Sequence, residues 1–197
     1  PDSFFFTLLC AIISLTGVAI RAMTVGYLPR KTEDEVTSGV KSTELITQGM
    51  YSIVRHPIAL GNLLAWYGII LYVGVSWFII GAILLYTLFT YQILLCEEEE
   101  LAKRFGDRYS LWASYTNALI PNRKLWIRSR DKFSLMQVLR REYIGFFFLV
   151  LTFVTINLLR NRVIEFTWSL SPLWTVVGGA TLLFTIFIRL IIKLINK

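Results

Sequence analysis

Four apolar blocks without a charged residue constrain this chain more than any other feature. They cover residues 3–20, 57–96, 143–159 and 172–188. A helix needs about 20 apolar residues to cross a hydrocarbon core of roughly 30 Å. The block 57–96 is long enough to cross twice, with a tight reversal at 72–77. The sequence therefore predicts an all-α, polytopic membrane protein with about five transmembrane helices.

The composition supports this fold class. Of the 197 residues, 55% are hydrophobic, which is rare in a soluble domain of this length. No internal repeat or low-complexity linker divides the chain, so we expect one integral membrane domain over 1–197. Cys10 and Cys96 lie far apart and lack metal-ligand spacing. We expect both to be small buried residues, with no disulfide and no metal site.

Positive charge is concentrated between the third and fourth predicted helices. The segment 97–142 holds ten Lys or Arg, whereas 160–171 holds only two. By the positive-inside rule 97–142 is cytosolic, and five crossings then put 21–56 and the C-terminus on the same side. A basic loop can also bind nucleic acid. Beside a membrane, attraction to anionic lipid headgroups is the simpler explanation, and we expect no nucleic-acid partner.

The polar segments between the blocks show less regular patterns. We expect 22–48 to be a cytosolic connector, with a short helix around 42–51. Apolar residues recur at helical spacing over 93–122, so the third helix is predicted to continue out of the membrane until Gly106 interrupts it. The basic segment 123–142 also contains aromatic residues, which suits a helix or loop lying on the bilayer surface.

The first polar motif is "GMYSIVRHPIALGN", residues 49–62, which holds the only histidine of the chain. Pro57 is well placed to begin a helix, because its missing N–H would have no partner in the first turn. Arg55 is then either an interfacial arginine beside a capping proline, or part of a site with His56 at the headgroup level. A helix start suits an anion, since its free N–H groups carry positive potential.

The second motif is a run of four glutamates, Glu97–Glu100, at the end of the third predicted helix. Consecutive helical residues diverge by about 100°, so at least one of these acids points toward the other helices. For Glu99 and Glu100 we favour a solvated collar paired with Lys103 and Arg104 at helical spacing. An inward Glu97 or Glu98 is a candidate functional group, because ionisable residues near the membrane are costly to retain there.

Taken together, the two motifs resemble those of a known family. The order "GMYSIVRHP", a predicted helical hairpin, and then "EEEELAKRFGDRYSLWASY" is similar to the isoprenylcysteine carboxyl methyltransferase family, which also resembles phospholipid methyltransferases. The resemblance covers 45–121, the expected methyltransferase core. It implies S-adenosylmethionine as methyl donor, bound in a cytosolic pocket formed by segments between the helices.

The resemblance also implies roles for particular residues. The catalytic pair is Arg55, which would position an anionic acceptor, and Glu98, the partner of the cofactor or of the reacting group. Gly61 would allow close helix packing at the hairpin. The implied cofactor-binding residues are His56, Pro57, Glu97, Glu98 and Tyr109.

Two features depart from the family pattern. The family usually has an aromatic residue, commonly Tyr, two positions after the proline, and here that position is Ala59. This chain either closes the cofactor pocket differently or has a weakened pocket. The additional C-terminal hairpin, 143–192, lies beyond the core pattern, and we expect it to shape the lipid-facing acceptor site.

The expected reaction is methyl transfer from S-adenosylmethionine to an anionic membrane lipid at the cytosolic interface. The chain resembles bacterial enzymes that act on membrane lipids, including a lipid A phosphate methyltransferase, which implies the bacterial cytoplasmic membrane. We rank a lipid phosphate or other anionic headgroup first, an isoprenylcysteine-type carboxylate second, and the amine of phosphatidylethanolamine third. An anionic oxygen needs no base, whereas an amine needs His56 or Glu98 to take its proton.

Two readings without catalysis remain. A lipid-binding membrane scaffold would share the basic cytosolic face, and Ala59 is the residue that favours it. A small transporter would need polar residues within the helices, where Asn62 and Gln92 are the main candidates and no repeat is visible. Binding of S-adenosylmethionine separates the enzyme from the scaffold.

Overall fold

The computed structural model describes residues 4–28, 44–164, 166 and 170–195, and within these ranges it contains helices and no strands. The main helices are α1 (Phe4–Gly26), α4 (Pro57–Val73), α5 (Ser76–Phe105), α7 (Leu135–Ile164) and α8 (Pro172–Ile195). Shorter elements are α3 (Met50–Ile53), α6 (Asp107–Tyr115) and the 3-10 turn η1 (Arg123–Leu125). The all-α architecture predicted from the apolar blocks is confirmed.

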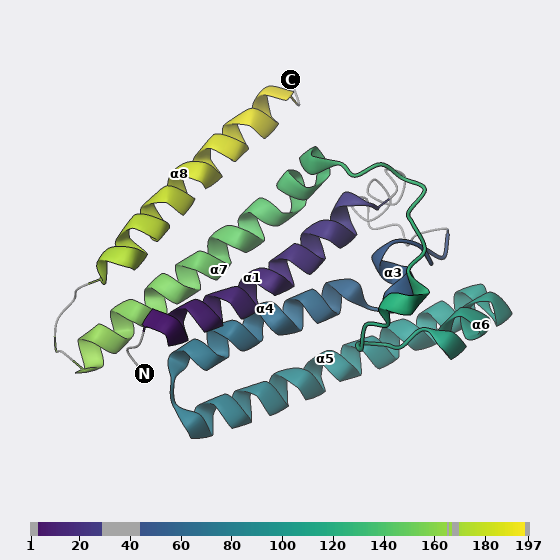
Figure 1. The fold of residues 1–197 in the computed structure, drawn as a ribbon, viewed down its shortest axis with the longest axis horizontal. Coiled ribbons are helices and arrows are strands. Elements are labelled where there is room, and N and C mark those ends of the chain that lie inside the picture. Colours follow the sequence, from purple (N-terminus) through teal and green to yellow (C-terminus); the bar gives the residue numbers. More distant parts are fainter. Residues whose placement is uncertain (1–3, 29–43, 165, 167–169, 196–197) are drawn as a thin grey trace.

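The five long helices lie side by side in the order α8, α7, α1, α4 and α5 (Figure 1). Four of them are long and apolar enough to cross a membrane, and α4 is a shorter apolar helix of 17 residues. At 1.5 Å per residue α4 covers roughly 25 Å, which is near the lower limit for a crossing. The helices therefore form a polytopic membrane protein.

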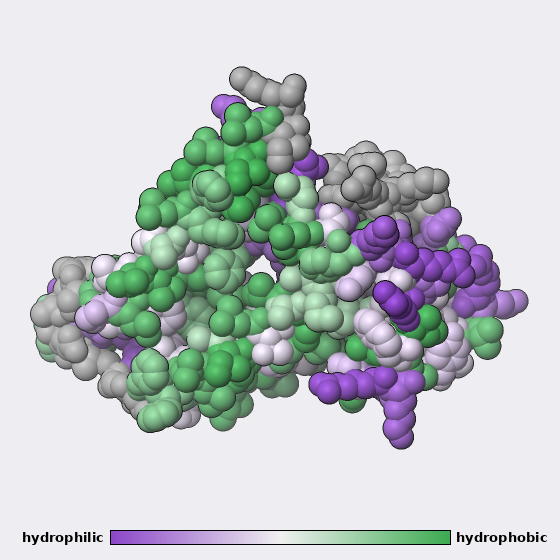
Figure 2. Space-filling view, turned by 45° about the horizontal axis from the view of Figure 1, so that its top comes forward, coloured by the Kyte–Doolittle hydropathy of each residue, from purple (hydrophilic) through white to green (hydrophobic). Residues whose placement is uncertain are grey.

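Polar residues gather at one end of this array. Figure 2 shows a largely apolar body, with hydrophilic side chains concentrated toward the end that holds α3 and α6. The C-terminal end of α1, the start of α4, the end of α5 and the start of α7 all lie toward this end (Figure 1). The two segments around 21–56 and 97–142 were predicted to lie on the same side, because two membrane crossings, now α4 and α5, separate them.

Small residues bring α1 and α4 close together. A Cβ added at Gly61 would lie 2.7 Å from the backbone oxygen of Gly17, and one added at Gly68 would overlap Ser14. The Ser14 hydroxyl donates a 2.8 Å hydrogen bond to the Ala65 carbonyl across the same crossing. Apolar attraction between helices is weak in lipid, so such close approach is a main source of association. Gly61 thus packs against α1, whereas the sequence placed its contact within the α4–α5 hairpin.

Two glycines define the ends of α5. Gly74, with φ of 78°, closes α4 and makes the predicted reversal before α5 begins at Ser76. Gly106, with φ of 53°, ends α5 and starts α6. Both positions use left-handed backbone that glycine adopts without steric cost. The predicted continuation of α5 beyond its apolar part, with an interruption at Gly106, is confirmed.

The structure corrects three boundaries. Helix α1 continues through Gly26, so the predicted connector 22–48 begins as helix, and its part over 29–43 lies outside the described residues. The short helix expected around 42–51 is only the turn α3, since 44–49 is not helical. Residues 135–142 belong to α7 rather than to a surface segment, because no Gly or Pro interrupts them. Cys96 is exposed rather than buried.

Three aromatic residues join α4, α7 and α8 at the other end of the molecule. Tyr72 is 1% exposed and its hydroxyl accepts a 2.8 Å hydrogen bond from Trp174 Nε1. The rings of Phe153 and Trp174 stack with their centroids 5.2 Å apart. Buried tyrosine and tryptophan need a partner for their polar atoms, and here each satisfies the other. The C-terminal helices are therefore packed onto the core of the bundle.

Candidate functional site

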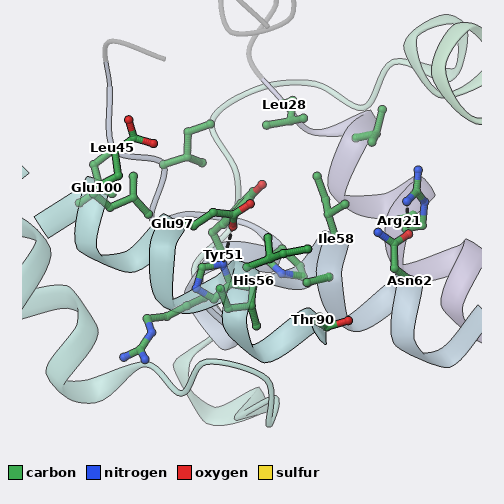
Figure 3. A pocket seen from close by; sticks show the side chains of 18 of the residues that line it. Arg21, Leu28, Leu45, Tyr51, His56, Ile58, Asn62, Thr90, Glu97 and Glu100 are labelled. Carbon is green, nitrogen blue, oxygen red and sulfur yellow. Dashed lines mark hydrogen bonds and ion pairs between the residues drawn. The ribbon is translucent and has the colours of Figure 1, made fainter. Parts of the chain in front are cut away.

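A cavity of about 780 Å³ opens among the helices at the polar end (Figure 3). Its walls come from the end of α1, from α3, from the start of α4, from the second half of α5, from α6 and from the start of α7. Of the six residues singled out for catalysis or cofactor binding, four line it directly, namely Arg55, His56, Pro57 and Glu97, whereas Glu98 and Tyr109 are not among its lining residues. Ala59 lines it as well.

The backbone around His56 is held by a segment from beyond α6. The Arg55 N–H donates to the Asn117 carbonyl at 2.8 Å, and the His56 N–H donates to the Ala118 carbonyl at 3.1 Å. These bonds hold residues 55 and 56 outside any helix, and α4 begins at Pro57, which needs no N–H partner. The His56 side chain therefore lies against α5, at the residue directly before α4 begins.

His56 lies between the two glutamates that the sequence favoured as inward-facing. Its Nε2 is 3.1 Å from Glu98 Oε1, and its Nδ1 is 3.4 Å from Glu97 Oε2. The ring is 8% exposed. A carboxylate can only accept, so both contacts are hydrogen bonds only when the ring carries a proton on each nitrogen. The site can therefore hold a proton between two acids.

Arg55 completes the contacts of Glu98. Its Nη2 is 2.7 Å from Glu98 Oε1, and its Nη1 donates to the Ala113 carbonyl at 2.8 Å. Glu98 thus lies between a guanidinium and an imidazole, with its side chain 24% exposed. The structure brings Arg55, His56, Glu97 and Glu98 together, although the two motifs are about forty residues apart.

Two tyrosines near these acids keep their protons. Burial, with a further contribution from Glu97, raises the pKa of Tyr51 to about 12, and the positive charge of Arg141 opposes that shift. Burial and the charge of Glu98 raise the pKa of Tyr109, while Arg55 lowers it. Both phenols are hydrogen-bond donors at neutral pH. Tyr109 is 6% exposed and lies beside the acids, on α6.

Four buried polar atoms around α6 lack a hydrogen-bond partner among the described residues. They are Arg55 Nε, Tyr109 Oη, Trp112 Nε1 and Thr116 Oγ1. A buried donor without a partner costs about 1–3 kcal/mol, so such a concentration in one place indicates partners outside the protein. Arg55 and Trp112 also line the cavity. The donors suit a ligand that is rich in oxygen and nitrogen acceptors.

A second polar cluster borders the cavity and was not predicted. Arg21 of α1 makes two contacts with Glu142 of α7, Nε to Oε2 at 2.8 Å and Nη2 to Oε1 at 2.9 Å. Its Nη1 also donates to Asn62 of α4. Figure 3 shows Arg21 and Asn62 on the opposite side from Tyr51, His56 and Glu97. The available signal was that Arg21 directly follows, and Glu142 directly precedes, an apolar block.

The remaining glutamates of the run, Glu99 and Glu100, are both exposed, as expected for a solvated collar. Glu99 is exposed and pairs with Lys103 at 2.6 Å, as the helical spacing predicted. Glu100 is exposed as well, and in addition it lines the cavity together with Arg104. The helix turns Glu97 and Glu100 to the same side, because residues three apart are neighbours on its surface.

Comparison with known proteins identifies one family. A family model described as phospholipid methyltransferase matches residues 5–108, just over half of the chain. The match covers α1, α3, α4 and α5, and it includes Arg55, His56, Glu97 and Glu98. No curated protein and no solved structure matches the chain.

Proposed function

Because the chain belongs to the phospholipid methyltransferase family, we propose that it transfers a methyl group from S-adenosylmethionine to an anionic oxygen of a membrane-lipid headgroup. The observation that carries this proposal is that Arg55, His56 and Glu97 line a cavity between apolar helices, while Glu98 contacts Arg55 and His56 behind that wall. A soluble donor can enter such a cavity from the polar end, while a lipid acceptor stays in the bilayer. The proposed location is a bacterial cytoplasmic membrane, with this end facing the cytosol.

The residues at the cavity fit S-adenosylmethionine. When bound, this cofactor supplies an electrophilic methyl group on a positively charged sulfonium. The cofactor-binding residues are proposed to be His56, Pro57, Glu97, Glu98 and Tyr109. The Trp112 N–H, which lines the cavity and has no partner among the described residues, suits its carboxylate and hydroxyl groups, and the Glu97 carboxylate suits its positive charges. Tyr109 and Glu98 lie directly behind these two groups of residues, in contact with Trp112 and with His56 respectively.

Arg55 and Glu98 are the proposed catalytic pair. Arg55 orients the Glu98 carboxylate through the 2.7 Å contact, and its Nε–H, which has no partner among the described residues, can donate to an anionic group. His56 fixes Glu98 from the other side. Holding donor and acceptor at the correct distance contributes much of the acceleration of such a transfer. These residues therefore position charge rather than form covalent bonds.

An anionic acceptor agrees with the charges at the site. A phosphate or carboxylate oxygen is already a nucleophile at neutral pH and needs no base. Its charge neutralises that of the sulfonium during transfer, so an environment that excludes water favours the reaction. A lipid phosphate, such as that of lipid A, is the first proposed acceptor, and an isoprenylcysteine-type carboxylate is the second.

One observation favours methylation of an aminolipid as an alternative. The cavity is lined by four acids as well as by basic residues, namely Glu44, Glu97, Glu100 and Glu142. Acids attract a cationic headgroup, and the arrangement Glu97–His56–Glu98 can accept the proton that an amine must lose. Phosphatidylethanolamine is the acceptor that this alternative predicts.

Calorimetry of cofactor binding tests the proposal. S-adenosylmethionine and S-adenosylhomocysteine are titrated into the purified protein in detergent, with Glu98→Ala and Ala59→Tyr alongside. The proposal predicts micromolar binding that weakens in Glu98→Ala. Tight binding only in Ala59→Tyr would mean that the small side chain at position 59 leaves the pocket weakened. Absence of binding in every variant would contradict the enzyme and favour a lipid-binding scaffold.

A further inference from the structure

The start of α7 contributes to the cavity although it lies outside the family match. Arg141 and Glu142 both line the wall, and the match ends at residue 108. Helix α7 therefore borders the cavity although it is not part of the region that the family shares. A cofactor site common to the family would not need α7, so α7 is free to contact the acceptor. Its two charged residues have very different contacts.

Glu142 is fully engaged within the protein. Its side chain is 9% exposed and it makes both contacts with Arg21 described above. An arginine–carboxylate pair with two parallel contacts is geometrically specific as well as strong. This pair joins α7 to α1 and fixes the rotation of α7 about its axis. Arg141, one residue earlier, is thereby held toward the cavity.

Arg141 has no ion pair or hydrogen bond with any residue that the structure describes. The other arginines of the wall differ in this respect. Arg21 contacts Glu142 and Asn62, and Arg55 contacts Glu98 and Ala113. Arg104 also has an interaction within the protein. Among the described arginines of the wall, Arg141 is therefore the one whose guanidinium has no ion pair or hydrogen bond with another described residue, so it can bind a molecule in the cavity.

Tyr51 supplies a second donor beside Arg141. Its phenol lines the cavity and is close enough to Arg141 for that charge to act on it. Because the pKa of Tyr51 is raised to about 12, its hydroxyl stays protonated and can donate. Both side chains line the cavity, and a guanidinium and a phenol O–H can each donate to a different oxygen of a phosphate, whose tetrahedrally arranged oxygens accept several hydrogen bonds.

We propose that Arg141, together with the Tyr51 hydroxyl, binds the headgroup phosphate of the lipid acceptor, so that α7 selects phosphate-bearing lipids. This inference rests on the proposed function in one respect, namely that the lipid bound by Arg141 is the molecule that receives the methyl group. The phosphate is either a terminal phosphate, which would itself receive the methyl group, or the phosphodiester of a larger headgroup. In this proposal Arg141 binds the acceptor and does not contact the cofactor.

The test measures binding of short-chain phosphatidic acid, phosphatidylethanolamine and diacylglycerol to the protein in detergent, without cofactor. Tryptophan fluorescence reports binding, since Trp112 lines the cavity. The variants are Arg141→Gln, Arg141→Lys and the control Arg140→Gln, which removes an equal charge from an exposed neighbour outside the wall. Melting temperature and affinity for S-adenosylhomocysteine show whether each variant keeps the fold and the cofactor site.

We expect Arg141→Gln to weaken phosphatidic acid binding roughly tenfold to a hundredfold, as loss of a charged hydrogen bond does. Arg141→Lys should recover part of it, and Arg140→Gln and diacylglycerol binding should not change. An equal loss for phosphatidylethanolamine identifies the phosphodiester as the group bound, and a loss confined to phosphatidic acid identifies the terminal phosphate.

Several results would overturn the inference. These are unchanged phosphatidic acid binding in Arg141→Gln, an equal loss in Arg140→Gln, an equal loss for diacylglycerol, or no phosphatidic acid binding by the parent protein. Failure of the proposed function is distinguishable from these. Arg141-dependent lipid binding by a protein that binds no S-adenosylmethionine would leave the phosphate site in place and contradict the methyltransferase.

Discussion

At the scale of residues, Glu98 is the centre of the site. It contacts the Arg55 guanidinium at 2.7 Å and the His56 ring at 3.1 Å, while the adjacent Glu97 approaches the other ring nitrogen. The sequence predicted that Glu97 or Glu98 faces inward, because four consecutive acids cannot share one side of a helix. It could not predict that Glu100 also reaches the cavity, since that depends on the path of α5 relative to α4.

Replacement of Glu98 tests its role directly. Glu98→Gln keeps the shape of the side chain and removes the charge opposite Arg55 and His56. We expect affinity for S-adenosylmethionine to fall roughly tenfold to a hundredfold, measured by calorimetry. Glu99→Gln is the matched control, because Glu99 is exposed and pairs with Lys103 on the solvent side of α5. Equal effects in both variants would contradict a specific role for Glu98.

Tyr51 makes a prediction about alkaline stability. Its pKa of about 12 exceeds the ordinary value of about 10, so between these values the folded state holds a proton that the unfolded chain has lost. The free energy of unfolding therefore decreases as the pH rises through this window. In Tyr51→Phe the melting temperature should fall less between pH 10 and pH 12 than in the parent protein.

Tyr115→Phe serves as the control for this measurement, because Tyr115 is 53% exposed. Its melting temperature should follow that of the parent protein across the same range. If Tyr51→Phe and Tyr115→Phe showed the same alkaline loss, Tyr51 would not be the buried phenol that the structure describes.

At the scale of elements, turns were predictable and helix contacts were not. Gly74 and Gly106 end helices through left-handed backbone, and both breaks follow from the sequence. The prediction that Gly61 packs within the α4–α5 hairpin was wrong, since it packs against α1. A small residue indicates a close contact without indicating which helix makes it. The Arg21–Glu142 pair was missed for a related reason. Single charges at the ends of apolar blocks are common, and only the packing of α1 against α7 joins these two.

The crossing of α1 and α4 supplies the prediction at this scale. Gly68→Ala places a Cβ against the Ser14 hydroxyl and the Cys10 carbonyl, so the helices must move apart. Overpacking of this kind costs about 1–3 kcal/mol, and we expect a fall of several degrees in melting temperature. Gly81→Ala is the control, because nothing lies within 4 Å of a Cβ at that position. A Gly68→Ala variant as stable as Gly81→Ala would refute the close crossing.

At the scale of the whole molecule, the polar end and the apolar body define an orientation. The basic segment 97–142 and the cavity lie at the same end, so the positive-inside rule predicts that the site faces the cytosol. The apolar blocks were sufficient to predict this arrangement. The apolar blocks could not predict that α7 would border the cavity, because the apolar residues of a helix do not indicate which other helices it packs against.

Cysteine labelling tests the orientation. In a protein with Cys10 and Cys96 replaced by serine, Ser110→Cys lies on the exposed part of α6 at the polar end, and Val75→Cys lies in the reversal at the other end. A membrane-impermeant maleimide added to intact cells should label Val75→Cys and spare Ser110→Cys. Inverted membrane vesicles should show the opposite pattern. Labelling of Ser110→Cys in intact cells would place the cavity on the outer side.

We propose above that this membrane protein methylates a lipid, with S-adenosylmethionine as the methyl donor. The most direct measurement supplies methyl-labelled S-adenosylmethionine to the protein in nanodiscs containing phosphatidic acid, lipid A or phosphatidylethanolamine, and follows label into the extracted lipid. We predict label in a phosphate-bearing lipid with the parent protein and a loss of about tenfold or more in Glu98→Gln. If label entered no lipid, or entered equally with Glu98→Gln, the account of this site would be contradicted.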